Sequence, residues 1–332
     1  MTIAGFAHVP GVITGWRWGI VIESLIAPIR IGDFFGIPIG IVQIVLVAGL
    51  AVYFGFTAIE NAAMRVMKQV PVPVIAFIII VMPGLVSSLI SAIVAAILIA
   101  ELVCFLPLQR AEMIKVTVIA CFSIGLGAAL TPVGEPLATI TIEKLAGPPY
   151  YAGFGYLVET IGYLVLPGIL ALGILGMVMI SRAGTVGISP RCRQYREPIR
   201  NVIVRALKVY VFIMALVLLG EGFNPLIMAI LPHTPATVLY WFNIVSAILD
   251  NATLASAEIS PVLTPLQIKS ALMGLIAAGV MLIPGNIPNI IASRKLKISS
   301  REWAKIAIPV GLVAMVIYFI AIFLPEYTRG LL

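Results

Sequence analysis

Two stretches decide the fold of this chain, Ser246-Ala-Ile-Leu-Asp-Asn-Ala-Thr253 and Ile283-Pro-Gly-Asn-Ile-Pro-Asn289. The first places an Asp, an Asn and a Thr inside an otherwise apolar run, and the second interrupts an apolar run with two prolines and a glycine. In lipid such polar groups are costly, and they mark functional positions. We therefore expect an ion or substrate site around these two stretches.

The composition around them predicts an all-α polytopic membrane protein. Of the 332 residues, 61% are hydrophobic and only 11% are charged, whereas a soluble domain carries roughly 25% charged residues. The apolar residues run continuously, without the alternation of a membrane β-barrel. The continuous runs cover residues 37–57, 72–106, 160–180 and 306–324.

The charge and the metal-binding residue types exclude several function classes. The formal net charge is +7, but Lys and Arg concentrate in short loops, which indicates membrane orientation rather than nucleic-acid binding. The three cysteines have no CxxC spacing and the two histidines lie far apart, so neither a disulfide nor a zinc site is expected. No cofactor is expected beyond a sodium ion acting as coupling ion or substrate.

We expect an interfacial or short membrane helix in residues 1–36, centred on 12–30, and then two membrane repeats. Each repeat contains a hairpin that enters and leaves on one side, and a transmembrane helix broken by prolines. Repeat 1 covers 37–180, with its hairpin at 72–106 and its broken helix at 113–145. A basic linker covers 181–200. Repeat 2 covers 201–325, with a span at 201–220, its hairpin at 223–263 and its broken helix at 267–296.

Loop charge predicts the sidedness of these segments. The Arg-rich linker 181–200 and the basic residues of 294–305 are both placed in the cytoplasm by the positive-inside rule. Helix 201–220 then exits outward and the broken helix 267–296 enters from outside, so the hairpin between them is re-entrant. The same parity makes the first hairpin re-entrant from the cytoplasm. The C-terminus is expected outside the cell membrane.

Opposite orientation of similar segments predicts an inverted repeat. Ser91-Ala-Ile matches Ser246-Ala-Ile, 155 residues apart, and Pro132 and Pro136 match Pro284 and Pro288, each 152 residues apart. This alignment pairs Asp250-Asn251 with Ala95-Ala96. Ion ligation is therefore expected to be asymmetric, with the charge in the second half.

Asp250 is the leading candidate ligand because it falls at the predicted tip of the second hairpin. Carboxylate, amide and hydroxyl oxygens suit a small hard cation, and a carboxylate also binds a proton. Asp250 and Asn251 are the candidate sodium ligands. The structural alternatives are helix caps at Asp250 and at Glu135. The full candidate set is Asp250, Asn251, Thr253, Glu135, Thr131, Asn286, Asn289, Ser91 and Ser246.

Two further acidic residues lie on the returning arms of the two hairpins. Glu101 follows the first hairpin tip and Glu258 follows the second. We expect both to lie near a surface and to be solvated.

At Leu130-Thr-Pro-Val-Gly-Glu-Pro136, Leu249-Asp-Asn-Ala-Thr253 and Pro284-Gly-Asn-Ile-Pro-Asn289 the chain resembles the ion transporter superfamily. The branch it resembles most contains NhaD-type sodium/proton antiporters, arsenite permeases and a small prokaryotic group of cation transporters. The resemblance covers roughly residues 37–325 and implies ligand-bearing hairpin tips and unwound helices, a homodimer held by scaffold helices, and elevator-type movement.

The resemblance also implies roles for single residues. The Asp-Asn pair of the family carries over to Asp250 and Asn251, and its break residues carry over to Thr131, Glu135, Asn286 and Asn289. The first hairpin departs from the pattern of sodium-coupled carboxylate transporters because it lacks their polar tip, and the chain has fewer clear scaffold spans.

These observations predict a secondary active transporter and not an enzyme. The first hypothesis is a sodium/proton antiporter or related cation transporter; the alternative is a coupled transporter of a small anion, either a carboxylate or an oxyanion such as arsenite. A channel and an intramembrane enzyme are more distant alternatives, and the second lacks a facing pair of aspartates because Asp33 precedes the first span. The expected partners are a small ion or solute, the lipid bilayer and a second copy of the chain.

Overall fold

The computed structural model describes residues 18–26, short pieces between 28 and 65, and residues 70–104, 106–181 and 199–328. The described part is helical apart from a hairpin of two short antiparallel strands, β1 (Gly32–Phe34) and β2 (Ile37–Ile39). Five of its helices are long and apolar enough to cross a membrane. The chain is therefore a helical multi-pass membrane protein.

Each of the five long helices is long enough to cross a bilayer. At about 1.5 Å per residue, a helix of 20 residues crosses a hydrocarbon core of about 30 Å. The long helices are α4 (Val72–Ile90), α6 (Arg110–Ala128), α8 (Tyr156–Ser181), α9 (Ile199–Ile230) and α14 (Ser300–Thr328).

The other helices with fully described bounds are too short to cross on their own, because even the 15 residues of α12 extend only about 22 Å. They are α2 (Trp18–Ile26), α5 (Ala92–Cys104), α7 (Pro136–Leu145), α10 (Ala236–Phe242), α11 (Asn251–Glu258), α12 (Pro265–Gly279) and α13 (Ile287–Leu296), with 3-10 turns η1 (Leu231–His233), η2 (Asn243–Ala247) and η3 (Ile283–Gly285).

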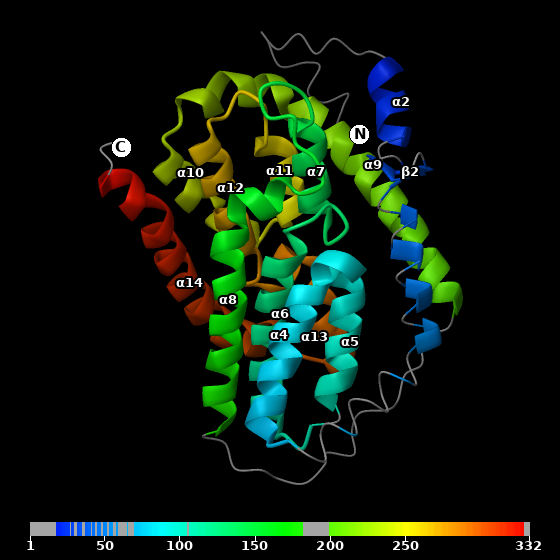
Figure 1. Cartoon of the computed structure of the whole chain (residues 1–332), viewed down its shortest axis with the longest axis vertical. Coiled ribbons are helices and arrows are strands. Elements are labelled where there is room, and N and C mark those ends of the chain that lie inside the picture. Colours follow the sequence, from blue (N-terminus) through cyan, green and yellow to red (C-terminus); the bar gives the residue numbers. More distant parts are fainter. Residues whose placement is uncertain are drawn as a thin grey trace.

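Two helical pairs fold back on themselves, and two helices are interrupted. The chain reverses at Ser91 between α4 and α5, and at 248–250 between η2 and α11. In Figure 1, α4 and α5 occupy the lower half of the molecule, whereas α10, α11 and α12 occupy the upper half. The segments α6–α7 and α12–α13 are each interrupted, at 129–135 and at 280–286. The prolines that predict these breaks lie in the gaps or just after them.

The expected boundary of the second hairpin is wrong. We predicted a span ending at 220 and a hairpin starting at 223, but α9 continues to Ile230 without interruption. The glycines at 220 and 222 do not end the helix because a helical glycine costs only about 1 kcal/mol relative to alanine. The expected linker 181–200 lies almost entirely outside the described residues.

The two halves interlock at the centre. Within each half, the first arm of the fold-back packs on the first part of the interrupted helix, α4 on α6 and α10 on α12. The returning arms cross over: α5 packs on α13, and α11 packs on α7. The second part of each interrupted helix is therefore held by the opposite half of the chain.

A side wall flanks this core. Helix α9 runs along one edge with α2 beside it, on the right in Figure 1, and the Tyr210 hydroxyl donates to the Leu25 carbonyl oxygen at 2.9 Å. A small apolar cluster of Val45, Ile93, Val209 and Ile213 joins the wall to α5. This contact is separate from the main apolar core.

Glycines allow α4 and α6 to pack backbone to backbone. A Cβ atom at Gly127 would overlap the carbonyl oxygen of Gly84. The Ser87 hydroxyl donates to the carbonyl oxygens of Gly84 at 2.6 Å and Ile124 at 3.2 Å. Small residues at a helix contact permit this approach in membrane proteins.

We predict that Gly127→Ala destabilises the protein because the added methyl group forces α4 and α6 apart. Overpacking of this kind costs about 1–3 kcal/mol. Thermal unfolding of the purified protein in detergent measures the loss. Gly153→Ala is the matched control, because nothing lies within 4 Å of a Cβ atom there. Equal melting temperatures for the two variants would contradict the close packing.

Candidate functional site

The site is built on two helix starts with the same backbone conformation. Glu135 precedes α7 with φ −154° and ψ 161°, and Asn286 precedes α13 with φ −153° and ψ 149°. Prolines occupy the first turn of both helices, where the missing N–H would have no helical partner. Both side chains are consequently presented at the start of a half-length helix.

Each interruption is tied to a chain reversal. The Ala92 amide, at the start of α5, donates to the Gly134 carbonyl oxygen at 2.7 Å. At Gly285, a Cβ atom would run into the carbonyl oxygens of Ser246 and Gly279, so only glycine allows this approach. Ser91 itself adopts φ 78°, an uncommon conformation for a residue other than glycine. The two reversals and the two interruptions therefore meet.

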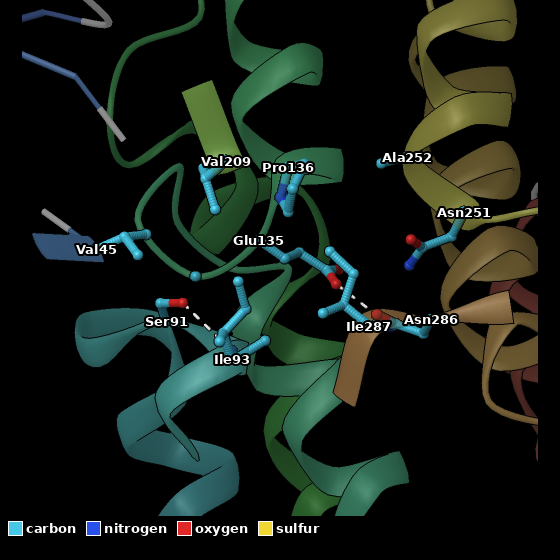
Figure 2. Close-up of a pocket in the computed structure, with 12 residues that line it drawn as sticks. Val45, Ser91, Ile93, Glu135, Pro136, Val209, Asn251, Ala252, Asn286 and Ile287 are labelled. Carbon is cyan, nitrogen blue, oxygen red and sulfur yellow. Dashed lines mark hydrogen bonds between the residues drawn. The ribbon is translucent and has the colours of Figure 1, made fainter. Parts of the chain in front are cut away.

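They meet around a small cavity, shown in Figure 2. Its polar lining consists of Ser91, Glu135, Asn251 and Asn286, which come from all four of these segments. The space that the centre of a water molecule can occupy among these residues is about 10 Å³, which is room for about one water molecule. Four apolar side chains, Val45, Ile93, Val209 and Ile287, form the remainder of the wall, together with Ala92, Gly134, Pro136 and Ala252.

Glu135 is the central acidic group of the cavity. It is 2% exposed, and its Oε2 accepts a hydrogen bond from Asn286 Nδ2 at 3.4 Å, the dashed line in Figure 2. Its Oε1 is buried without a hydrogen-bond partner, and so is Nδ2 of Asn251. A carboxylate oxygen and an amide nitrogen of the cavity wall therefore have no close hydrogen-bond partner, and Asn251 lies near enough to Glu135 to stabilise its carboxylate.

Four helix N-termini contribute to the cavity wall. The first residues of α5, α7, α11 and α13 are Ala92, Pro136, Asn251 and Ile287, and all four line it. Each N-terminus carries roughly half an elementary positive charge. Two carboxylates oppose this field, since Glu135 is close enough to Asp250 for their charges to repel.

Asp250 itself has a capping role in the structure. It precedes α11, and its Oδ2 accepts from the Thr253 amide at 3.1 Å and from the Thr253 hydroxyl at 3.4 Å. It is partly exposed and does not line the cavity. Asp250 and Thr253 thus fit the alternative of a helix cap, and Asn251 is the member of the pair that reaches the cavity.

Three other candidates have backbone partners. The Thr131 hydroxyl donates to the Ser88 carbonyl oxygen, and the Ser246 hydroxyl donates to the Leu275 carbonyl oxygen at 3.0 Å. Asn289 Nδ2 donates to the carbonyl oxygens of Gly279 at 3.1 Å and Leu282 at 2.9 Å. These side chains hold the interruptions and the reversals together without lining the cavity.

The expectation that Glu101 and Glu258 are solvated is wrong. Glu258 is 5% exposed. Glu101 is 4% exposed and forms an ion pair with Lys295 across the α5–α13 contact. Lys144 occupies the same ninth position of α7 that Lys295 occupies in α13, and its Nζ donates to the Ser256 carbonyl oxygen of α11 at 2.5 Å. Sequence reasoning missed both lysines, although they are 151 residues apart, the separation of Glu135 and Asn286.

No group of three His, Cys, Asp or Glu side chains in the described residues could hold a metal ion. The carboxylate and amide oxygens of the cavity are hard ligands, of the kind that hard cations prefer.

A family model described as a protein of unknown function (DUF1646) matches residues 1–324, and the chain belongs to this family. No curated protein matches the chain. The family description carries no activity, so the function rests on the geometry of the site.

We predict that Lys295→Met costs about 3 kcal/mol, the lower end for a broken buried pair, because it leaves the Glu101 charge buried without its partner. The double variant Glu101→Gln, Lys295→Met should recover most of this loss. A double-mutant cycle of thermal unfolding in detergent measures the coupling. Additive single losses would show that the two side chains do not interact.

Proposed function

We propose that this member of the DUF1646 family is a secondary active transporter that exchanges a small monovalent cation, sodium in the first place, for protons. The observation that carries the proposal is a cavity of water size with a free carboxylate oxygen of Glu135 in its wall. A cation and a proton compete for such an oxygen, which is the requirement for exchange. The size of the space favours a single bare ion over a polyatomic solute.

The architecture proposed for this function is an inverted repeat. Two fold-backs, α4–α5 and the segment from α10 to α11, and two interrupted helices, α6–α7 and α12–α13, supply one cavity. Helix α4 is long enough to cross a membrane, whereas α5, α10 and α11 are not. The crossed packing of α5 on α13 and of α11 on α7 supports two equivalent halves, as does the shared backbone conformation of Glu135 and Asn286. Re-entrant hairpins and a binding site at the repeat interface are typical of secondary transporters.

We place Glu135 at the centre of exchange, in the role that sequence reasoning gave to Asp250. Glu135 is buried and lines the cavity, with Asn286 beside it and Asn251 across from it. In this scheme the carbonyl oxygen of each Asn side chain turns toward a bound cation, and Asp250 tunes the field from its capping position. A buried carboxylate lacks hydration, so it gains much from either a cation or a proton.

Alternating access then requires the polar and apolar walls of the cavity to separate. Val209 belongs to α9 of the side wall and Val45 lies in the same small apolar cluster, whereas Ser91, Glu135 and Asn251 belong to the interlocked core. A small apolar cluster joins the side wall to α5 there, and α9 also packs on α11 of the core. In the elevator-type scheme, the core slides along this wall and carries the ion with it.

The proposed setting is the cytoplasmic membrane, with loop 181–200 inside, the C-terminus outside and the side wall contributing to a homodimer. Basic residues of α13 and the start of α14, from Arg294 to Lys305, agree with a cytoplasmic location of that end by the positive-inside rule.

A small anion is the second candidate, and one observation favours it. Four helix N-termini line the cavity, and helix N-termini attract anions. An anion would use the free Nδ2 of Asn251 as a donor. Under this reading, Glu135 binds a proton that is transported together with the anion.

We predict that Glu135→Gln abolishes sodium-dependent proton movement, because the amide cannot exchange a proton for a cation. Dequenching of a pH-sensitive dye in proteoliposomes after sodium addition measures the exchange. Glu143→Gln is the matched control, since Glu143 lies on the same helix with an exposed side chain. Full exchange in Glu135→Gln would remove Glu135 from the mechanism.

Asp250→Asn separates the two roles of that residue in the same assay. Asparagine is as good a cap as aspartate, so the fold and a purely structural role survive the change. A shifted sodium dependence would show that the charge of Asp250 acts on the ion. An unchanged response would leave Asp250 as a cap alone.

We predict that lithium and sodium drive exchange and caesium does not, because the cavity holds about one water-sized species. A series of alkali chlorides at equal ionic strength in the dye assay measures this. Thermal shift with small carboxylates and oxyanions tests the second candidate, because a ligand that binds the folded state raises the melting temperature. Stabilisation by an anion in the thermal-shift assay, together with no response to any cation in the dye assay, would favour the anion transporter.

A further inference from the structure

One face of α14 carries positive charge at its start and apolar side chains along the next turns. Arg301 and Lys305 lie in the first two turns of the helix and are exposed. The exposed side chains that follow are Ile308, Leu312 and Val316, which are 37%, 41% and 47% exposed. Spacings of three and four residues place these five positions in one row along a helix. The row therefore changes from charged to apolar along its length.

The apolar part of this row faces lipid. Helix α14 runs along the left edge of the molecule in Figure 1, with α9 on the opposite edge. It is long and apolar enough to cross a membrane, so its exposed apolar side chains lie against lipid chains. The rise from Lys305 to Val316 is about 16 Å, and half of a typical hydrocarbon core is about 15 Å. The apolar part of the row therefore matches the depth of one leaflet.

The cations at the start of the row have no carboxylate partner within the part of the chain that the structure describes. The same holds for Arg294 and Lys297, two exposed cations just before the turn into α14. The neighbouring acid, Glu302, is engaged elsewhere, because its Oε1 and Oε2 accept from Nε and Nη2 of Arg110 at 3.0 and 3.1 Å. The charge of this corner is therefore not balanced by the described residues around it.

The start of α14 is held in place by its other side chains. The Trp303 indole Nε1 donates to the Val280 carbonyl oxygen at 3.1 Å, at the interruption between α12 and α13. Glu302 accepts from the amide and the hydroxyl of Ser299, each at 2.8 Å. The exposed cations are thus presented from a fixed helix, and a ligand does not have to order the backbone that carries them.

Membrane orientation alone does not account for this arrangement. The positive-inside rule determines the side of the membrane on which Lys and Arg accumulate, and it is indifferent to the face of the helix that carries them. Arg301 and Lys305 share one row with the lipid-facing side chain of Ile308. Long basic side chains near the end of a membrane helix extend to the level of the lipid head groups.

We propose that this face of α14 binds an anionic phospholipid, with the phosphate group at Arg301 and Lys305 and an acyl chain along Ile308, Leu312 and Val316. The guanidinium group of an arginine donates two parallel N–H bonds to phosphate oxygens, and the lysine ammonium group adds a second positive charge. A free phosphate would leave the apolar row unused, whereas a phospholipid contacts both parts of it. This site is separate from the cavity at Glu135.

The test is native mass spectrometry of the purified full-length chain in a neutral detergent, titrated with dioleoylphosphatidylglycerol. We expect Lys305→Gln to weaken binding of the first lipid about fivefold, and the double variant Arg301→Gln, Lys305→Gln to weaken it about 25-fold. Lys208→Gln is the matched control, since Lys208 is also an exposed lysine on a long apolar helix, α9. Equal weakening by Lys305→Gln and Lys208→Gln would overturn the proposal, and so would unchanged binding in the double variant.

Two further titrations distinguish a phospholipid from other phosphates. Dioleoylphosphatidylcholine has the same chains without net charge, and glycerol 3-phosphate has the phosphate without chains. We expect both to bind more weakly than dioleoylphosphatidylglycerol. Equal binding of the first would overturn the role of the cations, and equal binding of the second would overturn the role of the apolar row. None of these measurements involves transport, so failure of the proposed function remains distinguishable.

Discussion

The whole structure depends on one constraint: a backbone polar group inside a membrane protein needs a partner within the protein. The interruptions at 129–135 and 280–286 release such groups in the middle of the helical bundle. The bond from the Ala92 amide to the Gly134 carbonyl oxygen, and the two bonds from Asn289 to the carbonyl oxygens of Gly279 and Leu282, supply partners. The chain reversals and the helix interruptions therefore stabilise each other, and their meeting leaves the cavity.

The interruptions could be predicted from the sequence because proline and glycine act locally. A proline lacks the amide that a helix interior requires, and this holds whatever packs around it. The boundary of α9 could not be predicted in the same way. A glycine only weakens a helix, so whether the helix continues through 220–230 depends on tertiary packing that no local pattern encodes.

The alignment that the sequence predicts between the two halves differs from the observed helix starts by about one helical turn. The alignment paired Asp250-Asn251 with Ala95-Ala96, whereas α5 begins at Ala92 and α11 at Asn251. Ser91 is thus the positional counterpart of Asp250. Identical Ser-Ala-Ile triplets set the alignment, and they lie at different distances from the reversal in the two halves.

The sequence also does not show which of the two carboxylates, Asp250 or Glu135, lines the cavity. A lone Asp beside Asn and Thr is more conspicuous than a Glu between a glycine and a proline, so Asp250 was ranked first. The structure separates the two by side-chain direction: Asp250 turns back onto the Thr253 amide, as N-cap residues do, while Glu135 has no such bond and lines the cavity. A polar residue that is rare in an apolar run indicates a role. Only its side-chain geometry shows whether it caps a helix or faces the cavity.

In the proposed function, the difference between the two halves sets the charge of the site. Glu135 and Asn286 occupy equivalent positions with nearly the same backbone angles, yet one is an acid and the other an amide. Two carboxylates in these positions would repel across a space of water size, and two amides would offer no charge to exchange. An acid facing an amide gives a single charge with a neutral partner, and one monovalent cation or one proton balances that charge. In the proposed repeat, the shared backbone supplies the geometry of the site, and the unequal side chains set its charge.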